Sequence, residues 1–99
     1  MPLVVKISTR AAREVKEAAE WWHENRPAAP GAIGKDFGEA VALLAEQPGI
    51  GAKHAGARLG SVRRLYLSRV RYFIYYSFDE QSLKVLAFWH ASRELPPRI

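Results

Sequence analysis

The first half of the chain changes from a strand-like to a helical pattern of hydrophobic positions. Residues 3–7 form a short run of apolar, largely β-branched side chains between a proline and a serine, which predicts a strand. From residue 9 the apolar side chains recur every three or four positions, and this spacing predicts a helix over 9–25. The prolines of 25–31 interrupt the pattern, and a second stripe predicts a helix over 31–46 that ends before Pro48. Two helices joined by a short turn are expected to form an antiparallel hairpin.

The second half returns to strand-like patterns after a glycine-rich segment. Residues 49–60 carry four glycines, which weaken helices and strands and suit a loop. Three runs rich in β-branched and aromatic residues then predict strands over 62–67, 72–78 and 83–89, with connections short enough for antiparallel hairpins. The predicted order β-α-α-β-β-β defines one α+β domain over residues 1–99, with the helical hairpin packed on an antiparallel sheet.

The predicted strands are apolar on both faces. Because side chains alternate along a strand, one face of the middle strand carries Tyr72, Ile74, Tyr76 and Phe78, and the other carries Phe73 and Tyr75. The same rule assigns one face of the last strand to Leu86, Phe88 and His90, and the other to Leu83, Val85, Ala87 and Trp89. The helical hairpin covers one face only. Two explanations stay open for the second face: the 49–60 loop and the 94–99 tail cover it, or it receives a partner.

Positive charge is concentrated in the second half of the chain. Of 15 Lys and Arg and 10 Asp and Glu, residues 1–50 hold six and seven, and residues 51–99 hold nine and three. The net charge of +5 favours an anionic partner such as nucleic acid, the ribosome or an acidic protein. The chain has no cysteine, which excludes disulfides, thiolate metal sites and a cysteine nucleophile. No run is long and apolar enough for a membrane span, so we expect a cytoplasmic protein that does not bind membranes.

Several pieces of the sequence together resemble the RelE/ParE superfamily of bacterial toxins, which are encoded beside an antitoxin. They are Ser8-x-x-Ala11, residues 28–44 leading to Pro48-Gly49, Val62-Arg63-Arg64-Leu65, Tyr72-Phe73-Ile74-Tyr75-Tyr76 and residues 85–93, which end in His90-x-x-Arg93. They cover nearly the whole chain, and the final strand is most similar to the ParE branch. The resemblance implies the same β-α-α-β-β-β order. It also implies a small toxin that its antitoxin neutralises by wrapping a C-terminal segment around it.

The superfamily contains two mechanisms, and the fold alone does not separate them. RelE-like members cut mRNA on the ribosome, whereas ParE-like members are understood to inhibit DNA gyrase and are not known for chemistry of their own. RNA cleavage needs a general base, a general acid and cations beside the phosphate. For that mechanism His90, Arg63 and Arg93 are the candidate catalytic residues, since histidine titrates near neutral pH and arginine binds phosphate through paired hydrogen bonds. The ribonucleases generally continue into a basic, tyrosine-bearing segment that this chain lacks, which favours the ParE-like mechanism.

We therefore expect a toxin that acts by binding its target, DNA gyrase by resemblance, and that a cognate antitoxin inhibits. An acidic, amphipathic antitoxin segment is expected on the helices and on the second sheet face. The candidate residues for binding the target or the antitoxin are Arg64, Arg71, Phe73, Tyr75 and Trp89. The alternatives are a RelE-like, ribosome-dependent mRNA endoribonuclease and a non-toxic basic domain that binds nucleic acid.

The remaining expectations concern cofactors and assembly. No glycine-rich phosphate loop is present, and no cofactor is expected. The three histidines, His23, His54 and His90, have no carboxylate or cysteine at metal-site spacing, so no metal site is expected, and His23 and His54 receive no role. The resemblance implies a hetero-oligomer of toxin and antitoxin that contacts operator DNA only through the antitoxin.

Overall fold

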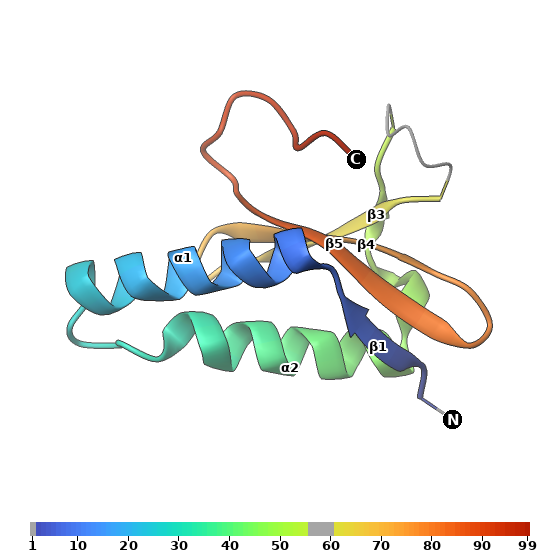
Figure 1. Ribbon diagram of the computed structural model, residues 1–99, viewed down its shortest axis with the longest axis horizontal. Helices are drawn as coiled ribbons and strands as arrows, with labels where there is room; N and C mark the ends of the chain where they lie inside the picture. The colour runs from blue at the N-terminus through green and yellow to red at the C-terminus, as the bar shows by residue number, and fades with distance from the viewer. Residues whose placement is uncertain (1, 56–60) are drawn as a thin grey trace.

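The polypeptide forms a helical hairpin that lies on one side of a five-stranded sheet. The structure is a computed structural model that describes residues 2–55 and 61–99. Its elements are β1 (Val4–Ile7), α1 (Thr9–Asn25), α2 (Ala32–Glu46), the short 3₁₀ helix η1 (Pro48–Ile50), β2 (Ala52–Lys53), β3 (Arg63–Leu67), β4 (Tyr72–Phe78) and β5 (Ser82–His90). Figure 1 shows both helices below the sheet and the C-terminal tail above it. The predicted α+β fold, with a helical hairpin on a sheet, is confirmed.

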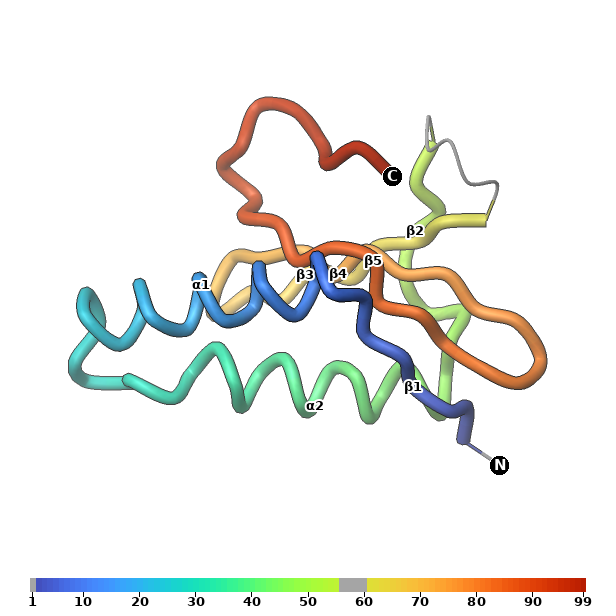
Figure 2. Tube along the Cα trace, in the orientation of Figure 1, coloured from blue at the N-terminus to red at the C-terminus, as the bar shows by residue number. Residues whose placement is uncertain are grey.

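The sheet is mixed, whereas the sequence predicts an antiparallel one. Its strand order is β1-β5-β4-β3-β2. The pairs β3–β4 and β4–β5 are antiparallel as predicted, and β2, which was not predicted, also pairs antiparallel with β3. The N-terminal strand β1 instead pairs parallel with β5, from Val4 opposite Ser82 to Ile7 opposite Val85, and Figure 2 shows the two strands side by side. Parallel pairing requires a long connection, which the intervening helices and strands supply.

The segment expected to be a loop, residues 49–60, contains regular structure where it is described. The 3₁₀ helix η1 reaches into it, and β2 pairs antiparallel with the start of β3. Its residues 56–60 lie outside the described part of the chain. Two residues of strand carry too little periodicity for sequence analysis to find, because a strand pattern needs at least four positions.

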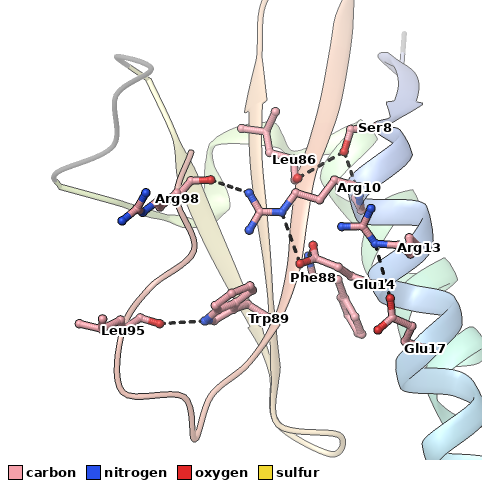
Figure 3. Close-up of polar contacts among 11 residues, drawn as sticks. Ser8, Arg10, Arg13, Glu14, Glu17, Leu86, Phe88, Trp89, Leu95 and Arg98 are labelled. Carbon is pink, nitrogen blue, oxygen red and sulfur yellow. Dashed lines mark hydrogen bonds and ion pairs between the residues drawn. The ribbon is translucent and has the colours of Figure 1, made fainter.

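Polar contacts attach the first helix to strand β5 (Figure 3). Ser8 caps α1, since its hydroxyl oxygen accepts the backbone N–H of Ala11 at 3.0 Å and the same hydroxyl donates to the carbonyl of Leu86 at 3.3 Å. Nearly two turns later Glu14 accepts the backbone N–H of Phe88 at 3.1 Å. These two contacts fix the height and rotation of α1 against β5.

The main hydrophobic core lies between the helices and the sheet. Its larger buried members are Ile33, Leu44, Val70, Ile74, Tyr76, Leu83, Val85 and Phe88. The side chain of Tyr76 is fully buried, and its hydroxyl donates to the carbonyl of Pro48 at 2.7 Å and accepts the N–H of Gly51 at 3.0 Å. A Cβ atom at Gly51 would lie 2.5 Å from that hydroxyl oxygen, so only glycine fits at this position. The tyrosine thus fastens η1 to the sheet.

A β-bulge in β5 overturns the predicted division of its side chains between the two faces. Tyr75 lies opposite Ala87 and Tyr76 lies opposite Val85, which leaves Leu86 as an extra residue on β5. As a result Val85 faces the helices, whereas Ala87 faces the other side. The prediction that Leu83 and Val85 share a face with Ala87 and Trp89 is therefore wrong, because a bulge shifts the alternation by one residue.

The C-terminal tail covers part of the second sheet face. This face carries a smaller cluster of Val62, Tyr75 and Ala87, with Phe73, Leu86, Trp89 and Ile99 packed against it. The tail is held by a hydrogen bond from the indole N–H of Trp89 to the carbonyl of Leu95 at 2.9 Å, and by Arg10, which donates to the carbonyl of Arg98 (Figure 3). Pro97 is buried. The tail thus supplies part of the coverage that the first of the two explanations predicts, and a partner on the rest of this face stays a prediction.

No helix within residues 2–55 and 61–99 is long and apolar enough to cross a membrane.

Candidate functional site

A groove lies on the second sheet face, between the strands and the C-terminal tail. It has a volume of about 420 Å³. Its lining combines cationic and aromatic side chains with the start of the tail: Lys53, His54, Arg64, Phe73, Tyr75, Trp89, His90, Arg93, Glu94, Leu95 and Pro96. We call this the tail groove. Strands β2, β3, β4 and β5 all contribute to it, so its residues come together only when the sheet forms.

Two arginines of the tail groove lie over aromatic rings. The guanidinium carbon of Arg64 is 4.4 Å from the ring centroid of Phe73, and one of its nitrogens donates to the hydroxyl of Tyr75 at 3.3 Å. The guanidinium carbon of Arg93 is 3.9 Å from the ring centroid of Trp89. Neither arginine belongs to an ion pair within the described part of the chain. Each guanidinium packs against a ring, and the N–H groups that make no hydrogen bond can bind an anion.

His54, the residue after the end of β2, also lines the tail groove. His54 meets Tyr75 edge to face, with ring centroids 5.0 Å apart, and its backbone N–H donates to the carbonyl of Val62 at 2.8 Å. Burial, and to a lesser degree the positive charge of Arg64, lowers the pKa of His54 from its ordinary value. The imidazole is therefore more readily neutral than an exposed one. Sequence analysis assigned His54 no role, because the pairing of β2 with β3 that brings it here has no sequence signal.

The ring of His90 is oriented by its neighbours. Its Nδ1 accepts the backbone N–H of Ser92 at 3.1 Å and lies 2.6 Å from the hydroxyl oxygen of the same serine. A backbone N–H can only donate, so Nδ1 carries a lone pair and the neutral ring holds its proton on Nε2. The ring also meets Tyr72 edge to face at 4.9 Å between centroids.

The structure separates residues that the sequence analysis grouped together. Arg63 does not line the tail groove, because its guanidinium donates to the carbonyls of Gly49 at 3.2 Å and Gly51 at 2.7 Å. Arg71 lies in the turn between β3 and β4 and lines a different cleft. The other predicted residues meet in the tail groove: Arg64, Phe73, Tyr75, Trp89, His90 and Arg93.

The comparison with known proteins agrees with this architecture. A helical hairpin on a mixed sheet, in the order observed here, is the RelE/ParE-like fold. The family model described as "ParE toxin of type II toxin-antitoxin system, parDE" matches residues 5–95. The chain therefore belongs to the ParE toxin family of type II toxin–antitoxin systems, and the predicted membership of the RelE/ParE superfamily is confirmed.

A solved structure shares the fold. A chain of the chromosomal ParDE toxin–antitoxin system from P. aeruginosa superposes with a TM-score of 0.74, covering 91% of this chain and 97% of that chain. The sequence identity of 18% is low, so the likeness extends to the fold alone. No curated protein matches the chain.

Proposed function

We propose that the protein inhibits growth by binding a cellular target through the tail groove, and that the target is DNA gyrase, as is understood for ParE-like toxins. The observation that carries this proposal is that only some of the candidate arginines lie in the tail groove. Arg64 and Arg93 lie in the tail groove with free N–H groups, while Arg63 is engaged by backbone carbonyls outside it. The groove therefore presents a contact surface without the complete set of candidate catalytic residues. The site of action would be the cytoplasm.

We propose further that a cognate antitoxin neutralises the toxin by placing an acidic, amphipathic segment in the tail groove. Lys53, Arg64 and Arg93 supply positive charge there, against the single carboxylate of Glu94. The rings beneath the guanidinium groups supply apolar contact area, and arginine with aromatic residues is the usual composition of strong protein contacts. The resulting assembly would be a hetero-oligomer that reaches operator DNA through the antitoxin.

A second candidate function is the RelE-like ribonuclease, and one observation favours it. The pKa of His54 is lowered, so this histidine can accept a proton at neutral pH, and His90 lines the same groove with two arginines. Cleavage of mRNA in a translation extract, lost in both His54→Ala and His90→Ala, would support this mechanism.

Charge reversal at Arg64 tests whether the tail groove binds the antitoxin. Arg64→Glu places a carboxylate against the acidic segment and should weaken the toxin–antitoxin complex by about tenfold or more in a calorimetric titration. Lys6→Glu is the matched control, because Lys6 is exposed on β1, lies outside both helices and the lining of the tail groove, and undergoes the same change of charge. Equal affinity of wild type and Arg64→Glu would overturn the proposed docking site.

The structure also decides which aromatic residue is suitable for such a test. Tyr75 is 1% exposed, so Tyr75→Asp would bury a charge and unfold the protein. Phe73 is only partly buried, and Phe73→Leu removes the ring beneath Arg64 while keeping an apolar side chain. We expect this variant to fold and to bind the antitoxin several-fold more weakly, which is the usual size of a lost cation–π contact.

A further inference from the structure

The C-terminal tail, residues 94–99, lies on the second sheet face without joining the sheet. Among residues 2–55 and 61–99 its backbone makes no backbone–backbone hydrogen bond. Side chains hold it instead (Figure 3). The indole N–H of Trp89 on β5 donates to the carbonyl of Leu95 at 2.9 Å, and a guanidinium N–H of Arg10 on α1 donates to the carbonyl of Arg98. Both donors contact backbone carbonyls, which an extended segment of any sequence offers.

Two prolines keep this part of the tail extended. Pro96 and Pro97 have fixed φ angles, and each keeps the residue before it out of the helical region. Residues 96–99 belong to no helix, strand or turn. Proline-rich segments in this conformation dock in aromatic-lined grooves of other proteins, because their carbonyls are free to accept hydrogen bonds and they lose little entropy on binding. The tail therefore lies on its own sheet in the manner of a bound peptide.

The side chains of the tail also contact the sheet as those of a bound peptide do. Pro97 is buried, and Ile99 packs against the smaller apolar cluster of the second sheet face. Glu94 lies among the cationic side chains of the tail groove. Leu95 differs, since its side chain is 76% exposed and only its carbonyl takes part in holding the tail.

The two donors are positioned by the rest of the fold and not by the tail. The Nε atom of Arg10 lies 3.4 Å from one carboxylate oxygen of Glu14, and the other oxygen accepts the backbone N–H of Phe88 at 3.1 Å. Trp89 stands on β5, where it is paired with Phe73 of β4. Arg10 and Trp89 are also neighbours, with 5.6 Å between the guanidinium carbon and the ring centroid. Both would stay in place if the tail left, so the site is preformed.

We propose that this part of the second sheet face is a docking site for an extended peptide segment, and that the antitoxin binds by displacing the tail from it. The inference rests on the proposed function, because it takes the antitoxin as the occupant of the tail groove. It adds the conformation of the antitoxin segment, which is extended, and the contacts that its backbone makes with Arg10 and Trp89.

Charge complementarity identifies the antitoxin segment as the stronger occupant. The tail places one carboxylate, that of Glu94, beside Lys53, Arg64 and Arg93. An acidic segment places several carboxylates there, and it needs one apolar side chain in the position that Ile99 occupies. It therefore makes the contacts of the tail and adds ionic ones.

A synthetic peptide with the sequence of residues 93–99 tests the docking site. The tail competes with it at an effective concentration in the millimolar range, so the protein is used as Ile99→Ser, which loosens the tail and leaves the sheet unchanged. At millimolar concentration the peptide should shift the indole N–H resonance of Trp89 in an NMR spectrum, identified by its loss in Trp89→Phe. The same peptide with the change Ile99→Ser should bind several-fold more weakly. Absence of a shift, or equal binding of the two peptides, would overturn the site.

The affinity of tail variants for the antitoxin tests the displacement. Ile99→Ser should bind the antitoxin several-fold more tightly than the wild type, because a weakened tail competes less. Leu95→Ser is the matched control: it also removes an apolar side chain from the tail, but an exposed one, and should leave the affinity unchanged. Calorimetric titration measures all three proteins.

The result for Arg64→Glu separates failure of this inference from failure of the proposed docking site. An affinity of Ile99→Ser equal to or weaker than that of the wild type overturns displacement of the tail. If Arg64→Glu weakens the same complex, the antitoxin still docks in the tail groove and only the displacement is wrong. If Arg64→Glu has no effect, the proposed docking site is wrong and the displacement with it.

Discussion

The indole N–H of Trp89 donates a hydrogen bond to the carbonyl oxygen of Leu95 at 2.9 Å, and this bond attaches the C-terminal tail to the last strand of the sheet. The ring of the same tryptophan lies under the guanidinium of Arg93. The side chain of Trp89 therefore contacts both the tail and Arg93, and all of them line the tail groove. A partner that enters the groove meets the tail as well as the sheet.

Trp89→Phe should loosen the tail without emptying the groove. The variant keeps an aromatic ring for Arg93 but removes the donor to Leu95, a loss of about 0.5–1.5 kcal/mol. We expect faster hydrogen–deuterium exchange in peptides that cover residues 93–99 and unchanged exchange in α2. Exchange in the tail that matches the wild type would show that the bond does not hold it.

The hydroxyl of Tyr76 should be worth about 1–3 kcal/mol of stability, because Tyr76→Phe leaves the buried N–H of Gly51 and the carbonyl of Pro48 without a partner. Urea unfolding measures this loss. Tyr66→Phe is the control, since Tyr66 is 46% exposed and should change the free energy of unfolding by less than about 0.5 kcal/mol. Equal stability of the two variants would contradict the role of Tyr76 in fastening η1.

The pKa of His54 should report on the tail groove. Burial is the larger cause of its lowered pKa and Arg64 the smaller one, so Arg64→Gln should raise this pKa part of the way toward 6.5 without reaching it. An NMR titration of the imidazole protons measures both variants. A pKa in Arg64→Gln equal to that of the wild type would mean that the guanidinium does not act on the imidazole.

The same lowered pKa has a consequence for stability. The unfolded state takes up a proton at His54 near pH 6.5, whereas the folded state takes it up only at lower pH. The free energy of unfolding should therefore fall as the pH drops below about 6.5, and Arg64→Gln should reduce this dependence.

Regular periodicity made most of the fold predictable. The stripes of apolar residues in 9–25 and 31–46 correspond to α1 and α2, and the aromatic runs correspond to β3, β4 and β5. Each of these elements is long enough for its period to appear in the sequence. The sequence did not predict which side chains of β5 lie on which face of the sheet. The bulge at Leu86 arises from the pairing of β5 with β4, and no residue pattern within β5 indicates it.

The candidate site was predictable in part, for a related reason. Arg64, Phe73 and Trp89 stand on strands whose pairing follows from the predicted hairpins, so the tail groove could be anticipated from them. The positions of Arg63 and the tail depend on hydrogen bonds to backbone carbonyls at Gly51 and Leu95. Every residue has a carbonyl, so such contacts leave no mark in the sequence.

A DNA supercoiling assay with purified toxin and gyrase tests whether the protein acts by binding gyrase through the tail groove. We predict that the wild type blocks supercoiling, that Arg64→Glu relieves the block, and that Lys6→Glu retains it. Reporter mRNA in a translation extract should stay intact in the presence of the same toxin preparation. Normal supercoiling together with cleavage of that mRNA would contradict the claim and establish the ribonuclease mechanism.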